Sequence, residues 1–309
     1  MAVRTSFAEP IVKLSPVLLF FILGAISLVI WWNPLVTSFA LALHDDQYTH
    51  LLLIFPVSVA LIFLDWKSPE PFSLVNLKLG AVLLAFAVGI TAPSRLGFLR
   101  LHSDEKLSLN ILALVVWWMG AFISAFGTRS FKRALFPLGF LFWMIPIPEL
   151  LLNPLVRLLQ EGSAAAANLF FTVAGVPVAQ EGTRITIPGL SLEVARECSS
   201  IRSSLMLVVT TMVLAQLLLR SPWRKAVVIA LAVPLSVVKN GLRIFVLGQL
   251  GTRVDPTFLT GKLHRQGGII YFLIALIFIF FALWLARLGE LKTGLRRDHS
   301  LGASIPESK

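Results

Sequence analysis

Eight long apolar segments constrain the fold of this chain more than any other feature of its sequence. Each is close to the ~20 residues that an α-helix needs to cross a lipid bilayer. The segments cover residues 16–33, 51–65, 77–93, 107–126, 131–148, 199–219, 226–248 and 268–287. Charged residues make up only 14% of the 309 residues, whereas a soluble globular domain has about 25%. We therefore expect an all-α polytopic membrane protein, with about eight transmembrane helices in a single integral-membrane domain, residues 1–309.

The net charge of +11 has two explanations. A basic chain could bind nucleic acid, but basic loops beside membrane spans explain the charge more simply. We therefore expect membrane lipid, and no nucleic acid, among its partners. The single cysteine, Cys198, excludes an internal disulfide and a cysteine-rich metal site. His44, His50 and His102 show no convincing metal-ligand spacing, so we expect no metal and no cofactor.

Residues 149–197 differ from a simple membrane span. Their first half has helical periodicity but carries Arg157, Gln160 and Glu161, which is typical of an amphipathic helix at a membrane surface. Apolar residues then alternate with polar ones on both sides of Pro188, and this pattern predicts a short β-hairpin. A hairpin cannot face lipid, because its edge groups would lack hydrogen-bond partners. We expect this segment to lie outside the bilayer or to be buried in protein.

The distribution of Lys and Arg favours one orientation in the membrane. With the N-terminus in the cytoplasm and residues 149–197 kept outside, fifteen of the 27 basic residues face inward, nine face outward and three lie within helices. This bias follows the positive-inside rule. The predicted chain has five spans in 1–148, an outer helix and hairpin in 149–197, the last three spans in 198–290 and a cytoplasmic tail in 291–309.

Three reactive side chains converge on the outer membrane face in this topology. Cys198 lies at the outer end of the sixth span, Arg243 near the outer end of the seventh, and His264 in the loop before the eighth. Each also has an ordinary explanation: a small buried hydrophobe for Cys198, a headgroup anchor for Arg243 and a loop histidine for His264. Their convergence is what favours a functional site.

Other polar residues surround these positions in the sequence. Cys198 precedes a helix, and helix dipoles together with nearby arginines favour a thiolate. Arg202 follows one turn later, where a structural or lipid-headgroup contact is the alternative explanation. Asn240 and Arg243, at i and i+3, share a helix face. Lys239 faces elsewhere, and we expect its side chain to snorkel to the membrane interface.

Three motifs follow one another in the second half of the chain. They are ECSSIRSS at 197–204, PLSVVKNGLR at 234–243 and HRQGGIIYF at 264–272. In order and spacing they resemble the exosortase/archaeosortase family of membrane cysteine transpeptidases, and the resemblance covers about 145–280, the hairpin included. Residues 46–66 are similar, more weakly, to an early Ser/Thr-His-Gly region of that family. Ser200 and Leu51 stand where many members have glycine, which leaves the subfamily open.

The resemblance implies a role for each candidate residue. Cys198 matches the nucleophile, Arg243 the arginine of the N-x-x-R motif, and His264 the third catalytic position, for which Arg265 is the alternative. A thiolate can form a thioester with a peptide carbonyl, a histidine can exchange the proton of the leaving amine, and an arginine can hold the oxyanion. The residues expected to bind substrate or support the site are Arg202, Asn240 and Arg265.

The resemblance also implies partners and a location. The substrates would be secreted proteins with a C-terminal sorting signal of the PEP-CTERM type: a short Pro-Glu-Pro-type motif, a hydrophobic helix and basic residues. The acceptor would be a lipid or polysaccharide at the cell surface, and the enzyme would lie in the cell inner membrane with its site on the periplasmic side. The alternative is a multi-pass transporter or export-complex component for an anionic solute or polysaccharide, with Arg202, Lys239 and Arg243 along its path.

Overall fold

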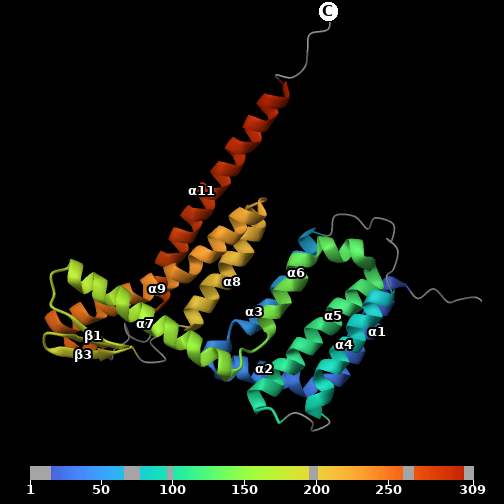
Figure 1. The fold of residues 1–309 in the computed structure, drawn as a ribbon, viewed down its shortest axis with the longest axis horizontal. Coiled ribbons are helices and arrows are strands. Elements are labelled where there is room, and N and C mark those ends of the chain that lie inside the picture. The colour runs from blue at the N-terminus through green and yellow to red at the C-terminus, as the bar shows by residue number, and fades with distance from the viewer. Residues whose placement is uncertain (1–14, 66–76, 96–99, 195–200, 260–267, 303–309) are drawn as a thin grey trace, which may run out of the picture. The chain divides into compact units, whose positions relative to one another are not determined.

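The computed structural model of the chain describes residues 15–65, 77–95, 100–194, 201–259 and 268–302, most of which are helical (Figure 1). The chain divides into two compact units, Met1–Glu149 and Leu150–Lys309. Each unit has its own packed interior, and each is described by itself.

The first unit is a bundle of helices. Its elements are α1 (Pro16–Ile30), α2 (Trp32–His44), η1 (Asp46–Tyr48), α3 (Leu51–Asp65), α4 (Leu77–Arg95), α5 (Ser103–Arg133), α6 (Leu135–Phe140) and η2 (Leu141–Met144). Ser15 caps α1 by accepting a hydrogen bond from the Leu18 N–H at 3.2 Å. At Trp31 the chain bends by 75° between α1 and α2, so the first expected span consists of two helices.

Helix α5 forms the core of the first unit, since α1, α2, α4 and α6 all pack against it. The closest packing is against α4, where Gly80 and Gly120 let the two backbones approach each other. The indole N–H groups of Trp117 and Trp118 donate to α1, to the Leu23 carbonyl at 2.9 Å and to the Ser27 hydroxyl at 3.0 Å. These bonds satisfy buried polar groups that lipid could not satisfy.

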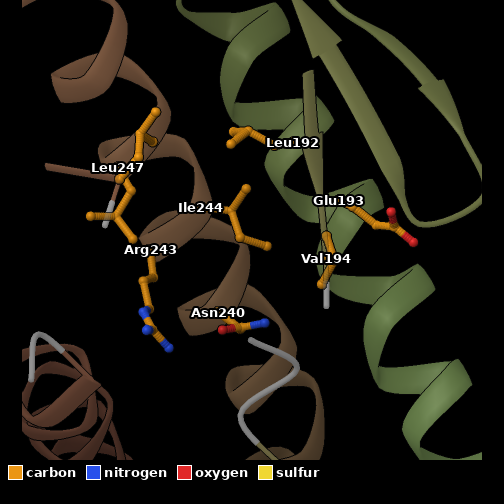
Figure 2. A pocket seen from close by; sticks show the side chains of 8 residues that line it. Leu192, Glu193, Val194, Asn240, Arg243, Ile244 and Leu247 are labelled. Carbon is orange, nitrogen blue, oxygen red and sulfur yellow. The ribbon is translucent and has the colours of Figure 1, made fainter. Parts of the chain in front are cut away.

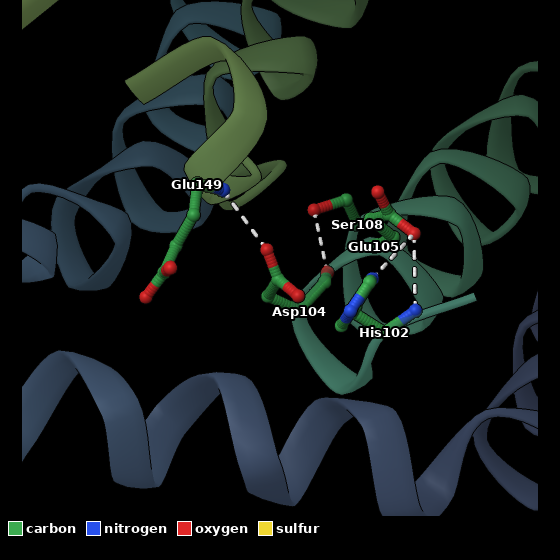
Figure 3. Close-up of polar contacts among 5 residues, drawn as sticks. All are labelled: His102, Asp104, Glu105, Ser108 and Glu149. Atoms are coloured by element: carbon green, nitrogen blue, oxygen red, sulfur yellow. Dashed lines mark hydrogen bonds and ion pairs between the residues drawn. The ribbon is translucent and has the colours of Figure 1, made fainter. Parts of the chain in front are cut away.

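A polar network anchors the last segment of the first unit to the start of α5 (Figure 3). The Asp104 carboxylate accepts from the Glu149 backbone N–H at 2.9 Å, and the Ser108 hydroxyl donates to the Pro146 carbonyl at 2.7 Å. His102 and Glu105 form a capping box that satisfies the first N–H groups of α5. This segment is therefore fixed by side chains rather than by regular secondary structure.

The second unit combines helices with a small antiparallel sheet. Its elements are α7 (Glu149–Val173), β1 (Ala179–Glu181), β2 (Arg184–Ile187), β3 (Leu190–Glu193), α8 (Ile201–Leu218), α9 (Pro222–Arg253), η4 (Pro256–Leu259) and α11 (Gly268–Gly302). The strands lie in the order β1-β2-β3. Gly182 and Gly189 take positive φ angles, of 59° and 81°, in the two turns, which glycine adopts without strain.

Two clusters of apolar side chains hold this unit together. One joins α8, α9 and α11 through residues such as Leu207, Val228 and Ile279. The other joins α7 to the sheet, with Phe171 and Ile185 completely buried. Phe245 of α9 packs against Phe171 with ring centroids 5.0 Å apart, so α9 belongs to both clusters.

The eight apolar segments all contain helix, but they do not all form separate spans. Four helices are long and apolar enough to cross a membrane: α5, α8, α9 and residues Gly268–Lys292 of α11. The number rises to six if each of two bent pairs, α1 with α2 and α6–η2 with α7, counts as one span. Helices α3 and α4 are apolar but shorter. The structure thus supports a mostly helical, multi-pass membrane protein with four to six candidate spans by length and composition.

The amphipathic helix and the hairpin are present, with one addition. Helix α7 covers most of the segment with mixed polarity, and β2 and β3 pair around the expected turn, with Ile187 opposite Leu190. The sequence did not predict β1, which pairs with β2 and makes the sheet three-stranded. The short, largely polar segment Ala179–Glu181 has no apolar alternation of its own, and it forms a strand by pairing along β2.

Candidate active site

A pocket lies between β3 and α9 in the second unit (Figure 2). The empty space in the pocket and in its open mouth, solvent included, is about 480 Å³. Its lining residues are Leu192, Glu193, Val194, Asn240, Arg243, Ile244, Leu247 and Leu259. Two of the residues predicted from the sequence to belong to the functional site, Asn240 and Arg243, therefore meet in one pocket, as their i, i+3 spacing suggests.

Glycines on α9 bring the neighbouring elements close to this helix. A Cβ atom on Gly241 would lie 2.5 Å from the Ala166 Cβ and 2.9 Å from the Ala167 backbone nitrogen of α7. A Cβ on Gly248 would lie 3.3 Å from Leu192, and one on Gly251 would lie 2.6 Å from Leu259. Leu192 and Leu259, which form pocket walls on β3 and η4, therefore pack directly against glycines of α9. Each of the three glycines, at 241, 248 and 251, faces a neighbouring element that a side chain would displace.

The pocket is polar at one end and apolar at the other. In Figure 2, the polar ends of Asn240 and Arg243 lie beyond Val194, whereas Leu192, Ile244 and Leu247 surround the opposite end. The Glu193 side chain points away from α9, and its carboxylate lies 3.8 Å from the Arg184 guanidinium. The polar end thus carries a guanidinium and a carboxamide.

Gln160 fixes the strand end that borders this polar region. Its side-chain amide, on α7, donates to the Val194 carbonyl at 2.7 Å, and the Val194 N–H donates to the Thr183 carbonyl at 3.0 Å. Val194 is 2% exposed. The backbone four residues before Cys198 is therefore held firmly beside α9.

Lys239 does not snorkel to the interface, contrary to the expectation from the sequence. Its side chain is only 6% exposed, and Nζ donates to the Ser203 hydroxyl of α8 at 2.5 Å. A long side chain snorkels when water is the nearest polar environment. Here the adjacent helix supplies a closer partner, so the lysine connects α8 to α9 one turn before Arg243.

Three of the six predicted site residues lie in the described part of the chain. Arg243 and Asn240 line the pocket, and Arg202 has an exposed side chain in the first turn of α8. Cys198, His264 and Arg265 lie outside the described residues.

The elements that flank the undescribed segments do converge on the same turns of α9. Val194 and Leu259 line the pocket with Arg243, and Ser203 is bonded to Lys239. Helix α11, which follows the segment with His264, packs against α9.

Within the described ranges, no group of three His, Cys, Asp or Glu side chains could hold a metal ion. His50 is buried and hydrogen-bonded locally, with Nδ1 3.1 Å from the Gln47 carbonyl oxygen. Its contacts are structural.

Sequence reasoning did not find the apolar pocket walls or the Lys239–Ser203 bond. Leu192, Leu247 and Leu259 come from three separate elements, and nothing in their local sequence distinguishes them from other leucines. The glycine spacing on α9 was the available signal, since glycines in a helix interior often mark close approach of another element.

One of three comparisons with known proteins gives a match. A search of curated proteins and a search of solved structures each returned no match. The family model described as transmembrane exosortase (Exosortase_EpsH) matches residues 31–281, which is most of the chain and includes the pocket, the sheet and every helix from α2 to α9. The protein therefore belongs to the transmembrane exosortase family.

Proposed function

We propose that this protein is a membrane-embedded cysteine transpeptidase that cleaves C-terminal sorting signals of secreted proteins and transfers the shortened protein to a surface acceptor. Cys198 acts as nucleophile, Arg243 stabilises the oxyanion, and His264 exchanges protons, with Arg265 as the alternative third group. Arg202 and Asn240 support the site.

One observation carries the proposal beyond family membership. The described residues nearest to Cys198 on both sides, Val194 and Ile201, belong to elements fixed against the turns of α9 that carry Lys239, Asn240 and Arg243. An extended chain spans at most ~3.3–3.6 Å per residue, so the short separation of Cys198 from Val194 in the sequence limits the distance between the thiol and the pocket. Leu259, the last described residue before the segment with His264, also lines the pocket. That described residues beside both segments belong to this one pocket supports the proposal.

The proposed reaction divides one difficult step into two. The Cys198 thiolate attacks the scissile carbonyl carbon, and the carbonyl electrons move onto oxygen, where the Arg243 guanidinium stabilises them. The C–N bond then breaks, His264 protonates the departing amine, and a thioester remains. An acceptor nucleophile attacks the thioester, gives its proton to His264 and releases Cys198. An arginine suits the oxyanion role because it stays protonated, and such a donor lowers the barrier by about 3–4 kcal/mol in known cases.

The setting fits a membrane-anchored substrate. The cleaved tail would consist of a short Pro-Glu-Pro-type motif, a hydrophobic helix and basic residues, and its helix would lie in the bilayer beside the enzyme's spans. We propose that the enzyme resides in the cytoplasmic (inner) membrane with its site on the periplasmic side, where lipid or polysaccharide acceptors are available.

The test is to co-express the protein with a secreted reporter that carries such a tail and to follow shortening of the reporter. Cys198→Ala and Arg243→Ala should abolish shortening while membrane insertion is retained, and His264→Ala should strongly reduce it. An impermeant maleimide should label Cys198 from outside and block the reaction. Processing that persists in Cys198→Ala would refute the proposal.

A transporter or export-complex component for an anionic solute or polysaccharide is the second candidate. The observation in its favour is the pair of cations, Lys239 and Arg243, one turn apart within α9. A transporter should tolerate Cys198→Ala and should lose transport in Lys239→Met, so the same variants distinguish the two functions.

A further inference from the structure

We propose that the pocket between β3 and α9 binds an extended peptide, with the Asn240 carboxamide hydrogen-bonded to one of its peptide groups and a neighbouring apolar side chain of the peptide seated between Leu192, Ile244, Leu247 and Leu259. Asn240 is thus a substrate-binding residue that fixes the register of the chain to be cleaved. This inference rests on the proposed function for the identity of the peptide, a secreted protein's tail. It does not depend on the identity of the nucleophile.

The Asn240 side chain is the observation that calls for a ligand. It is 1% exposed, and neither its Nδ2 nor its Oδ1 has a hydrogen-bond partner among the described residues. A buried polar group without a partner is costly, so an apolar residue would stabilise this position better unless something else pairs with the amide. The unpaired carboxamide therefore offers a ligand both a hydrogen-bond donor, Nδ2–H, and an acceptor, Oδ1.

A peptide group matches that requirement. Its C=O can accept from Nδ2 while a peptide N–H donates to Oδ1, so one stretch of backbone can satisfy both atoms. A lipid acyl chain would fill the apolar end of the pocket but would leave the carboxamide unsatisfied. A carboxylate or a phosphodiester could accept from Nδ2 but could not donate to Oδ1. Among these occupants, only the peptide satisfies the whole side chain.

The exposed edge of β3 offers a second set of backbone partners. The Val194–Thr183 pair is hydrogen-bonded, and hydrogen-bonded and non-hydrogen-bonded pairs alternate along an antiparallel ladder. Glu193, opposite Arg184, is therefore in a non-hydrogen-bonded pair, and its N–H and C=O point away from β2. Since β3 is the last strand in the order β1-β2-β3, these groups lie on an edge that no strand covers within the described part of the chain. An extended peptide is the ligand that such an edge pairs with.

The apolar end of the pocket supplies side-chain selectivity. Its walls are aliphatic. Leu192 and Leu259 lie close to α9 because Gly248 and Gly251 have no side chains to keep them away. A peptide that passes Asn240 in an extended conformation turns alternate side chains to the same face, so one of them enters this end. A small or medium apolar residue fits there, and a charged residue is excluded because the walls offer it no partner.

The experiment measures capture of the peptide without cleavage. A photo-crosslinking residue, p-benzoylphenylalanine, replaces Leu259 in the full-length Cys198→Ala protein, co-expressed with the secreted reporter that carries the Pro-Glu-Pro, apolar and basic tail. We expect capture of reporter residues just before the apolar segment, identified by mass spectrometry. The same replacement at Val227, an exposed residue near the other end of α9, should not capture those residues.

The decisive variants change Asn240 within this crosslinking protein. Asn240→Leu and Asn240→Ala should each reduce capture by about tenfold or more, because the peptide loses a buried hydrogen-bonding partner. The melting temperature of Asn240→Leu should stay the same or rise, since the unpaired amide is removed. Asn110→Leu, the same exchange at a position in the first unit whose amide donates to the Lys106 carbonyl of its own helix, should leave capture unchanged.

The results of the crosslinking experiment either support or refute the peptide site. Unchanged capture in the Asn240 variants, capture of lipid alone, or loss of capture accompanied by a lower melting temperature in both variants would overturn it. A further case separates the two proposals: no capture at Leu259 while the same reporter is shortened in a Cys198-dependent manner would refute the peptide site and leave the proposed function standing. Shortening that does not need Cys198 would refute the proposed function, and capture would still test the pocket.

Discussion

Replacement of Gly241 by alanine should damage both the stability and the activity of this protein, although Gly241 carries no functional group. Its added Cβ would lie 2.5 Å from the Ala166 Cβ, 2.9 Å from the Ala167 nitrogen and 3.0 Å from the Ala166 carbonyl carbon. Two of these three atoms belong to the α7 backbone and cannot rotate away. Helix α7 would have to move from α9 by about 1 Å to restore ordinary contact, and overpacking of this kind costs about 1–3 kcal/mol.

The expected loss of activity follows from the position of Gly241. It lies between Asn240 and Arg243, and α7 also carries Gln160, which holds the Val194 carbonyl at 2.7 Å. A shift of about 1 Å between these groups can slow a reaction by about 10²-fold. The assay is the rate of reporter shortening at matched protein levels, with thermal unfolding of the purified protein measured in parallel.

A matched control and a partial rescue make this prediction specific. Gly89→Ala, in α4, adds the same methyl group where no atom lies within 4 Å, so it should leave stability unchanged or improve it by up to about 1 kcal/mol. Ala166→Gly added to Gly241→Ala removes the contact at 2.5 Å but not the two backbone contacts, so it should restore only part of the stability. Wild-type stability and activity in Gly241→Ala would refute the packing argument for α7 and α9.

Three further predictions concern contacts outside the pocket. Gly80→Ala should destabilise the first unit by about 1–3 kcal/mol in thermal unfolding, because its Cβ would lie 1.9 Å from the Ser124 hydroxyl, and Ser124→Gly should rescue it; failure of the rescue would contradict the cause. Glu290 accepts from the backbone N–H groups of Arg220 and Ser221 just before α9, so Glu290→Ala should cost about 1 kcal/mol and speed hydrogen exchange at those amides, whereas Glu290→Gln, which keeps an acceptor, should change both less. Burial lowers the pKa of His50 below its usual 6.5, against the opposing effect of the Gln47 hydrogen bond. The unfolded chain then binds the proton more tightly, so stability is full above pH 6.5 and falls as the pH drops below it, and His50→Gln should weaken this acid sensitivity in melting curves.

The apolar pattern predicted where helices form but not how many spans they make. A run of apolar residues shows that a helix can be buried in lipid or protein, and all eight segments contain one. It does not show a bend such as the one at Trp31, which divides the first segment. The positive φ of 78° at Gly127, inside α5, does agree with the expected end of one segment at residue 126.

The candidate site could be predicted only where its residues share a helix. Asn240 and Arg243 were placed on one face by their spacing, and they line one pocket. Lys239 was misjudged because its partner, Ser203, lies on another helix and 36 positions away in the sequence. The leucine walls were missed for the same reason. Periodicity reports which face of an element a residue occupies, whereas tertiary contacts between elements depend on packing that no local pattern contains.

The proposed reaction requires that the acyl group of the substrate forms a thioester with Cys198 beside Arg243. Mass spectrometry of the protein isolated with the secreted reporter, in the absence of acceptor, tests this most directly. We predict an adduct on the tryptic peptide that contains Cys198, joined as a thioester to the C-terminus of the shortened reporter, and no adduct in Arg243→Ala. Shortened reporter without any adduct on Cys198, or an adduct that forms equally well in Arg243→Ala, would contradict the account.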